Sequence, residues 1–113
     1  MADMNDVLKE SKTLLGQLSK EHGALMQAFG GLGKAVMPDG ALSKKQKELI
    51  AVALGVASRC DKCIAHHVRG ALDNGATRAE IVEAAGVAVY MGGGPSLMYA
   101  ESVLQALDAF GAK

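Results

Sequence analysis

The sequence has very few large aromatic side chains. It contains no tryptophan, two phenylalanines and two tyrosines, and alanine and glycine supply much of its apolar content instead. A domain of this length buries only about two-thirds of the surface that its unfolded chain exposes. Because large side chains are few, we expect a thin core. In addition, several predicted helices are apolar around most of their circumference. The composition therefore predicts a homo-oligomer, in which other copies cover the remaining apolar surface.

The sequence also has no excess of charge of either sign. Twelve basic and twelve acidic residues give a formal net charge of zero at pH 7. Nucleic acids and anionic membranes attract basic surfaces, because both carry dense negative charge. The densest basic cluster, Lys44, Lys45 and Lys47, is typical of a solvated first helical turn. We therefore expect no nucleic-acid partner and no membrane partner.

Long hydrophobic runs and a secretion signal are missing as well. The longest uncharged apolar runs, Leu49–Ala57 and Ala84–Met91, are far shorter than the roughly 20 residues that span a bilayer. The segment Met1–Asp6 is polar and acidic, unlike a signal peptide. We therefore expect a cytoplasmic protein. In that reducing compartment its two cysteines indicate a catalytic or metal-binding role more than a structural disulfide.

No segment shows the alternation of apolar and polar residues that is typical of β-strands. Apolar residues instead recur at intervals of three and four, as on one face of a helix. We expect an all-α fold, a single helical domain over residues 1–113 with about five to six helices. The sequence indicates helices over 3–30, 43–57, 61–73, 77–91 and 96–110.

Local signals mark where several of these helices begin and end. Ser43 with Gln46, and Thr77 with Glu80, have the spacing of capping boxes. The helix that Ser43 opens is then apolar on all sides, so we expect it to be central and buried. Gly30-Gly31 is expected to end the first helix, and the glycine run before Pro95 to separate the last two.

The most informative segment is Cys60-Asp61-Lys62-Cys63, at the predicted start of the third helix. At about 100° per residue, Cys60, Cys63 and His67 lie within about 60° of one another, whereas His66 points about 100° away from His67. The spacing therefore selects His67 as the partner of the cysteines. Cysteines three residues apart on a helix approach closely enough for a disulfide if the first turn flexes.

The start of a helix favours reactive thiols. Its unpaired N–H groups and the positive end of its dipole stabilise a thiolate, which is the nucleophilic form of cysteine. His67 lies one turn beyond Cys63 and is placed to accept the thiol proton directly or through a water. Glu48 is the one carboxylate adjoining the apolar stretch of the preceding helix, so it is the nearest candidate to orient the His67 ring.

Other uses of the two cysteines fit the sequence less well. Attachment of c-type haem needs a histidine directly after the second cysteine, where this chain has Ile64. A structural zinc site needs four converging ligands, and the remaining His22 is distant in sequence. A thioredoxin-like domain places its cysteine pair after a strand. The alternative that stays open is a pair of core cysteines with a packing role alone.

Taken together, Glu48, Cys60-Asp61-Lys62-Cys63 and His67, followed by Gly75 and Glu80-Ile81, resemble the carboxymuconolactone decarboxylase and alkylhydroperoxidase D (AhpD)-like family. The resemblance covers roughly residues 35–107. It implies an all-α fold that assembles as a homotrimer or homohexamer, with thiol peroxidase or disulfide reductase activity. Some relatives have a further histidine between the cysteines, where this chain has Lys62, so a relay through that histidine is not expected here.

The resemblance also implies roles for individual residues. Cys63 corresponds to the peroxidatic nucleophile, Cys60 to a more exposed resolving thiol, and His67 with Glu48 to a proton relay that activates Cys63. In such a cycle a hydroperoxide oxidises Cys63 to a sulfenic acid and Cys60 condenses with it. An external dithiol, on a lipoylated or thioredoxin-like protein, then reduces the disulfide. We expect no metal, flavin, haem or other cofactor.

Two alternatives to this thiol chemistry stay open. The first is a carboxymuconolactone decarboxylase-type enzyme, which acts on a carboxylated lactone by acid–base chemistry and has no use for paired cysteines. The second is a non-enzymatic helical oligomer whose cysteines sense oxidation. Thiols with an ordinary pKa, near the free value of about 8.5, would favour the second alternative.

Overall fold

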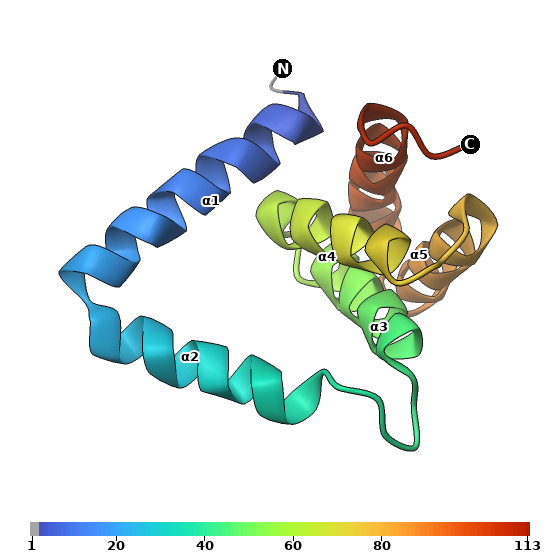
Figure 1. Ribbon diagram of the computed structural model, residues 1–113. Coiled ribbons are helices and arrows are strands. Elements are labelled where there is room, and N and C mark those ends of the chain that lie inside the picture. The colour runs from blue at the N-terminus through green and yellow to red at the C-terminus, as the bar shows by residue number, and fades with distance from the viewer. Residues whose placement is uncertain (1–2) are drawn as a thin grey trace.

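The computed structural model describes residues 3–113, and most of them lie in six helices (Figure 1). The helices are α1 (Met4–Glu21), α2 (Gly23–Val36), α3 (Lys44–Ala57), α4 (Asp61–Asp73), α5 (Arg78–Gly92) and α6 (Gly94–Ala109). No strand occurs within residues 3–113, and the predicted all-α fold is confirmed. Met1 and Ala2, part of the polar N-terminal segment, lie outside the described residues.

The core lies between α3, α4, α5 and α6, with the first half of α1 laid across α4 and α6 (Figure 1). The largest fully buried side chains are aliphatic: Val52, Val56, Ile64, Val68, Ile81, Val103 and Leu107. Burial of each such side chain stabilises the fold by about 1.5–3 kcal/mol. Tyr99 and Phe110 are only partly buried at the edge of this cluster. The core is therefore built from small and medium aliphatic side chains, as the scarcity of aromatics predicts.

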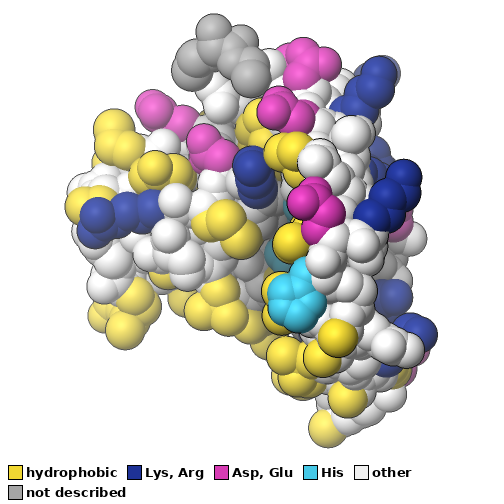
Figure 2. All heavy atoms as spheres, turned by 90° about the vertical axis from the view of Figure 1, so that its left-hand side faces the viewer, with side chains coloured by type: hydrophobic (Ala, Val, Ile, Leu, Met, Phe, Trp, Pro, Cys, Tyr) yellow, Lys and Arg dark blue, Asp and Glu magenta, His cyan; other side chains and the backbone are white. Residues whose placement is uncertain are grey.

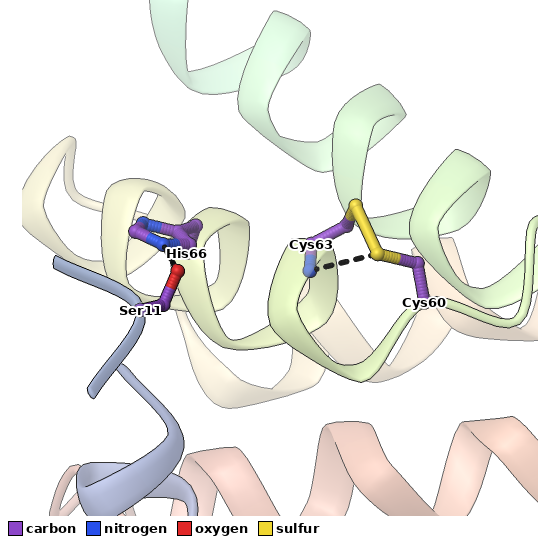
Figure 3. Close-up of a disulfide and its surroundings, with 4 residues drawn as sticks. All are labelled: Ser11, Cys60, Cys63 and His66. Carbon is purple, nitrogen blue, oxygen red and sulfur yellow. Dashed lines mark hydrogen bonds between the residues drawn. A yellow bond between two sulfur atoms is a disulfide. The ribbon is translucent and has the colours of Figure 1, made fainter. Parts of the chain in front are cut away.

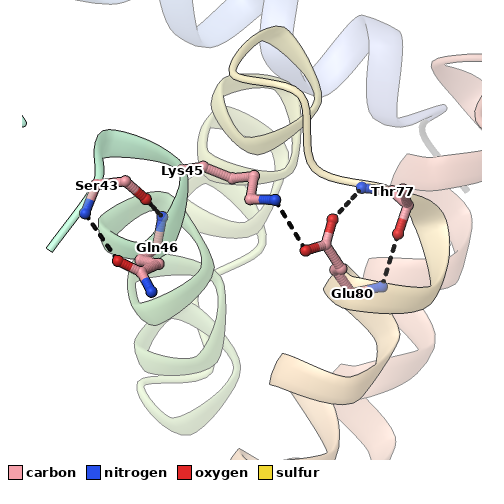
Figure 4. A network of polar contacts seen from close by, with 5 residues as sticks. All are labelled: Ser43, Lys45, Gln46, Thr77 and Glu80. Carbon is pink, nitrogen blue, oxygen red and sulfur yellow. Dashed lines mark hydrogen bonds and ion pairs between the residues drawn. The ribbon is translucent and has the colours of Figure 1, made fainter.

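Both predicted capping boxes form, and an ion pair joins them (Figure 4). The Ser43 hydroxyl accepts from the Gln46 N–H at 3.1 Å, and the Gln46 side chain accepts from the Ser43 N–H at 2.8 Å. Thr77 and Glu80 make the same exchange at the start of α5. Lys45 Nζ lies 3.0 Å from Glu80 Oε2. The Thr77 N–H and the Lys45 ammonium together hold the pKa of Glu80 below its usual value.

The prediction of one helix over 3–30 is wrong, because the chain bends at His22. This residue has φ −145° and ψ 67°, outside the helical region, although its N–H still reaches the Leu18 carbonyl at 2.7 Å. Gly23 follows, and glycine is about 1 kcal/mol less favourable than alanine inside a helix, so a break costs little here. The Gly30-Gly31 pair, expected to end the first helix, lies within α2.

After this bend, α1 and α2 form a V-shaped arm that stands away from α3–α6 (Figure 1). Among the described helices, α2 packs against α1 alone. Its far end is tied to α3 by Lys47, whose ammonium donates to the carbonyls of Val36 at 2.7 Å and Pro38 at 2.8 Å. The arm is thus held at its two ends and free of the core in between.

Much apolar surface is exposed on the single chain, on the arm and on α3. No residue of α2 is buried, and its large apolar side chains point outward: Leu25, Phe29, Leu32 and Val36. Figure 2 shows hydrophobic side chains spread between charged ones on the side that carries the arm. The predicted central position of α3 is confirmed, because α3 packs against α4, α5 and α6, but the predicted burial is wrong for this single chain: Ile50 is 47% and Leu54 60% exposed. None of the helices within residues 3–113 has the length and apolarity of a membrane span.

The later helix boundaries follow the sequence signals closely. Gly75 ends the turn after α4 with φ 88°, and Gly93 separates α5 from α6 with φ 71°. Both values lie in the left-handed region that glycine adopts without steric cost. Pro95 stands in the first turn of α6, where its missing N–H is harmless.

Candidate active site

The candidate site begins at the tight turn between α3 and α4. The Cys60 N–H donates to the Gly55 carbonyl at 3.0 Å, and the Arg59 N–H donates to Val56 at 3.1 Å. This pattern closes the last turn of α3 and reverses the chain. Arg59 has φ 54°, a left-handed conformation that costs a non-glycine residue about 1 kcal/mol or more. The strained turn places Cys60 directly at the start of α4.

Cys60 and Cys63 occupy the first turn of α4, where the sequence predicts them. Cys60 is the N-cap residue, and its sulfur accepts the Cys63 N–H at 3.2 Å (Figure 3). A disulfide joins the two residues, whose Cα atoms are 5.2 Å apart, within the usual range for such bonds. Both residues are partly buried. The greater exposure expected for Cys60 stays a prediction.

Glu48 and His67 meet between α3 and α4. His67 Nδ1 lies 3.2 Å from Glu48 Oε1, and the Glu48 side chain is only 8% exposed, against 38% for His67. A buried carboxylate needs a hydrogen-bonding partner, because burial removes its hydration. Since Glu48 engages Nδ1, the ring is oriented and Nε2 is left to exchange protons with a thiol or a bound molecule. The antiparallel pairing of α3 and α4 thus brings together the two residues that the sequence nominates as a relay.

Cys63 and His67 line one pocket on the surface of the chain. It has a volume of about 250 Å³, and its other walls are Ala51, Leu54, Gly55 and Ser58. These walls are mostly apolar and carry no lysine or arginine. Cys63 and His67 thus border the same small volume. Such a volume suits a small, uncharged molecule that reacts with a thiol.

His66 faces away from the cysteines and toward the arm. Its Nε2 lies 2.9 Å from the hydroxyl of Ser11 on α1 (Figure 3). Burial lowers the pKa of His66, and electrostatic repulsion from His67 and Lys12 lowers it further. His66 therefore joins α1 to α4, whereas His67 belongs to the cysteine pocket. Lys62, at the position where some relatives have a histidine, is exposed.

A glycine and a serine beside the site were not singled out from the sequence. Gly70 lies one turn beyond His67, and the Glu48 carboxylate rests against its backbone. Ser11 is one of the few buried polar residues. A glycine in the interior of a helix is a signal, because it weakens the helix without need. The sequence does not say which side chain of α3 lies opposite.

The donor groups of the site do not assemble into a metal centre. Across residues 3–113, no three side chains of His, Cys, Asp or Glu converge as ligands. His22, weighed above as a distant ligand, lies at the bend between α1 and α2. The sulfurs of Cys60 and Cys63 are bonded to each other.

Helices that present a cysteine pair beside a buried glutamate and its histidine partner define a class of small α-helical thiol proteins. Comparison with known sequences narrows this class to one family. A sequence model of the carboxymuconolactone decarboxylase family matches residues 23–106, which is most of the chain. The chain therefore belongs to the carboxymuconolactone decarboxylase family, as the resemblance predicted.

Similar proteins agree with this assignment over nearly their whole length. The solved structure of lpg0406 from Legionella pneumophila, a carboxymuconolactone decarboxylase family protein, is 48% identical, with a TM-score of 0.91 over 95% of this chain and 96% of that one. A Thermotoga maritima member, suggested to be involved in an antioxidative response, is 27% identical, with a TM-score of 0.81 over 91% and 88%. An uncharacterized Cupriavidus necator protein is 42% identical over 97% of both chains.

Proposed function

We propose that this protein is a thiol-dependent hydroperoxidase that uses Cys60 and Cys63 as its redox pair. One observation carries the proposal: Cys63 and His67 line the same pocket while His67 pairs with the buried Glu48. The antioxidative response suggested for the Thermotoga maritima relative is consistent with it. Cys63 is the nucleophile, Cys60 the resolving thiol, and His67 with Glu48 the proton relay.

In the reduced protein the relay and the helix start act together on Cys63. The N–H groups and the dipole at the start of α4 favour a thiolate at this position. His67 takes the thiol proton, and the nearby Glu48 carboxylate stabilises the imidazolium that forms. The result is a thiolate and an imidazolium facing the same pocket.

The thiolate of Cys63 then attacks the terminal oxygen of a hydroperoxide, and the O–O bond breaks. The leaving alkoxide takes the proton from His67 and departs as an alcohol, while Cys63 becomes a sulfenic acid. Cys60 attacks the Cys63 sulfur and releases water, which leaves the disulfide seen between them. An external dithiol returns both cysteines to thiols by exchange and is itself oxidised to a disulfide.

We also propose partners for this cycle. The small volume and apolar walls of the pocket favour a small alkyl hydroperoxide as substrate. The partly exposed disulfide is open to a lipoylated or thioredoxin-like reductant in the cytoplasm. The exposed apolar faces of α2 and α3 support a homo-oligomer, and we propose a homotrimer or homohexamer. The cycle needs no cofactor.

The test is peroxide consumption by the reduced protein with a dithiol in excess. We expect Cys63→Ser to abolish turnover. Cys60→Ser, reduced and then freed of dithiol, should consume about one equivalent of peroxide per chain and stop at a sulfenic acid that dimedone labels, whereas the wild type treated in the same way goes on to the disulfide. Lys62→Ser, an exposed neighbour on the same turn, is the matched control and should stay near the wild-type rate. Turnover at the wild-type rate by Cys63→Ser would contradict the proposal.

Decarboxylation of a carboxylated lactone is the less favoured function. A substrate with several carboxylates needs cationic groups around it, and the pocket of Cys63 and His67 has no lysine or arginine. Lactone turnover that survives alkylation of both thiols would favour this alternative. A redox sensor without turnover would show disulfide formation by peroxide but no sustained consumption with dithiol.

A further inference from the structure

The Glu48 carboxylate reaches across from α3 and lies against the backbone of Gly70 on α4. A Cβ atom at position 70 would overlap Glu48 Oε2 and stand 2.7 Å from the carboxyl carbon. Real Cβ atoms do not approach other atoms so closely, so any side chain at this position must displace the carboxylate. Around other helical glycines, such as Gly16 and Gly86, a Cβ would have no atom within 4 Å, while at Gly92, the last residue of α5, it would overlap the hydroxyl of Ser96.

The Glu48 side chain is only 8% exposed, and beside Gly70 it borders a cavity of about 640 Å³ that Gly33 and Lys34 of α2 also line. A displaced carboxylate therefore has room to leave its place beside His67. Toward the other end of the same helix pair, a Cβ at Gly55 would stand 3.3 Å from Ile64 Cγ1 and 3.4 Å from its backbone nitrogen. Two glycines thus let α3 and α4 approach closely, one against Ile64 and one against Glu48. At Gly70 the close neighbour is a charged group that also contacts His67.

The backbone of Gly70 does not itself require glycine. It lies inside α4, and its φ is not among the positive values found at Gly75, Gly93 and Gly111. A glycine at such a position weakens the helix relative to alanine. The residue is therefore explained by the space it leaves, and that space is filled by the carboxylate of Glu48.

We propose that Gly70 is a positioning residue of the active site: its missing side chain forms a notch that seats the Glu48 carboxylate and holds Oε1 against His67 Nδ1. The inference rests on the proposed relay through Glu48 and His67. It adds that the relay depends on a residue that bears no functional group. Gly70 acts through Glu48 and touches neither sulfur nor substrate.

The first test is the pH dependence of Cys63 alkylation by iodoacetamide, measured on the reduced full chain carrying Cys60→Ser. In this background Gly70→Ala should shift the profile to higher pH by about half a unit or more, since an imidazolium separated from its carboxylate supports the thiolate less well. Glu48→Gln should shift it in the same direction. Adding Gly70→Ala to Glu48→Gln should cause no further shift, because the two changes act at one point. Gly16→Ala, with open space around it, should leave the profile unchanged.

A second measurement, of the melting temperature Tm, tests whether Gly70→Ala destabilises the protein through its contact with Glu48. We expect this change to lower the Tm in the wild-type background but not in Glu48→Ala, where alanine merely replaces glycine in a helix and favours it. An equal fall in Tm in both backgrounds overturns the inference that the missing side chain of Gly70 seats the Glu48 carboxylate. A Gly70→Ala profile that superimposes on that of the wild type overturns the positioning role.

The same measurements separate this inference from the proposed function. A shift with Glu48→Gln but none with Gly70→Ala overturns the inference and leaves the relay standing. An unshifted Glu48→Gln profile overturns the relay, and the positioning role with it, while the Tm comparison still decides whether Gly70 makes room for Glu48.

Discussion

The body of the molecule, α3–α6, and the arm, α1 and α2, bury their apolar side chains to very different extents. All of the largest fully buried side chains belong to the body, which also carries Cys60, Cys63, Glu48 and His67. The arm is anchored through Met4, Leu8 and Ser11, but no residue of α2 is buried. The comparison indicates that the body supplies the stability and the site. The arm supplies a surface that a single chain leaves uncovered.

Truncation of a side chain in the core of the body has the largest expected effect on the free energy of unfolding. Ile64→Ala empties a fully buried position next to Gly55, and we expect it to lower the free energy of unfolding by about 2–5 kcal/mol. Urea unfolding followed by circular dichroism measures the change. The matched control is Leu32→Ala on α2, where the side chain is 60% exposed. Both variants are measured at a protein concentration low enough for the chains to be monomeric. Equal losses in the two variants would contradict the division into body and arm.

Changing the arm should alter assembly rather than folding. Leu25→Ser together with Phe29→Ser removes two large apolar side chains that are 48% and 59% exposed on the single chain. We expect light scattering to show smaller assemblies, while the circular dichroism spectrum stays that of the wild type because the body core is untouched. Gln27→Ser, at an exposed polar position of α2, is the control. A wild-type chain that is already single at working concentration would refute the role given to the arm.

Removal of a single hydroxyl group should weaken the contact between the arm and the body. Ser11→Ala removes the hydrogen bond to His66 Nε2, and we expect a loss of about 1 kcal/mol. Amide hydrogen exchange should then accelerate in α1 more than in α3–α6, because the change loosens the joint and not the core. Ser19→Ala, exposed on the same helix, should leave the exchange pattern as it is. Faster exchange across the body instead would mean that arm and core open together.

A smaller effect, on the pH dependence of stability, follows from His66, the partner of Ser11 in this hydrogen bond. Because burial lowers the pKa of His66, the unfolded chain binds a proton at this ring more readily than the folded chain does. Stability from neutral His66 is therefore complete above the unfolded value of about 6.5 and declines as the pH falls below it. We expect the protection factors of α1 to drop as the pH falls below about 6.5, and to drop less in His66→Gln. Parallel curves for the two proteins would exclude His66 as the cause.

The parts of the fold that local chemistry controls could be predicted from the sequence. The start of α4 follows from its residues, because Cys60 caps the helix and Cys63 lies three residues on. Helical spacing alone separates His67 from His66, and the structure places these two rings against different elements. Glu48 could be nominated because a carboxylate next to an apolar stretch needs a partner.

The remaining features depend on packing that periodicity does not record. Leu25 and Phe29 continue the apolar spacing of α1, so the pattern does not show the bend at His22. The exposure of Leu54 could not be predicted either, because an apolar helix looks the same whether its own chain or another copy covers it. The position of Gly70 could not be singled out from the sequence, because it is explained by the Glu48 side chain on the neighbouring helix α3.

The Glu48–His67 pair also touches a second opening in the molecule. His67 lines the pocket of Cys63, whereas Glu48 and Gly70 line a larger cavity of about 640 Å³ under the end of α2, and the two openings share no lining residue. The carboxylate of this pair therefore borders a space that is separate from the pocket of the cysteines. In the proposed cycle, a reductant that covers the disulfide would leave this second side of the pair uncovered.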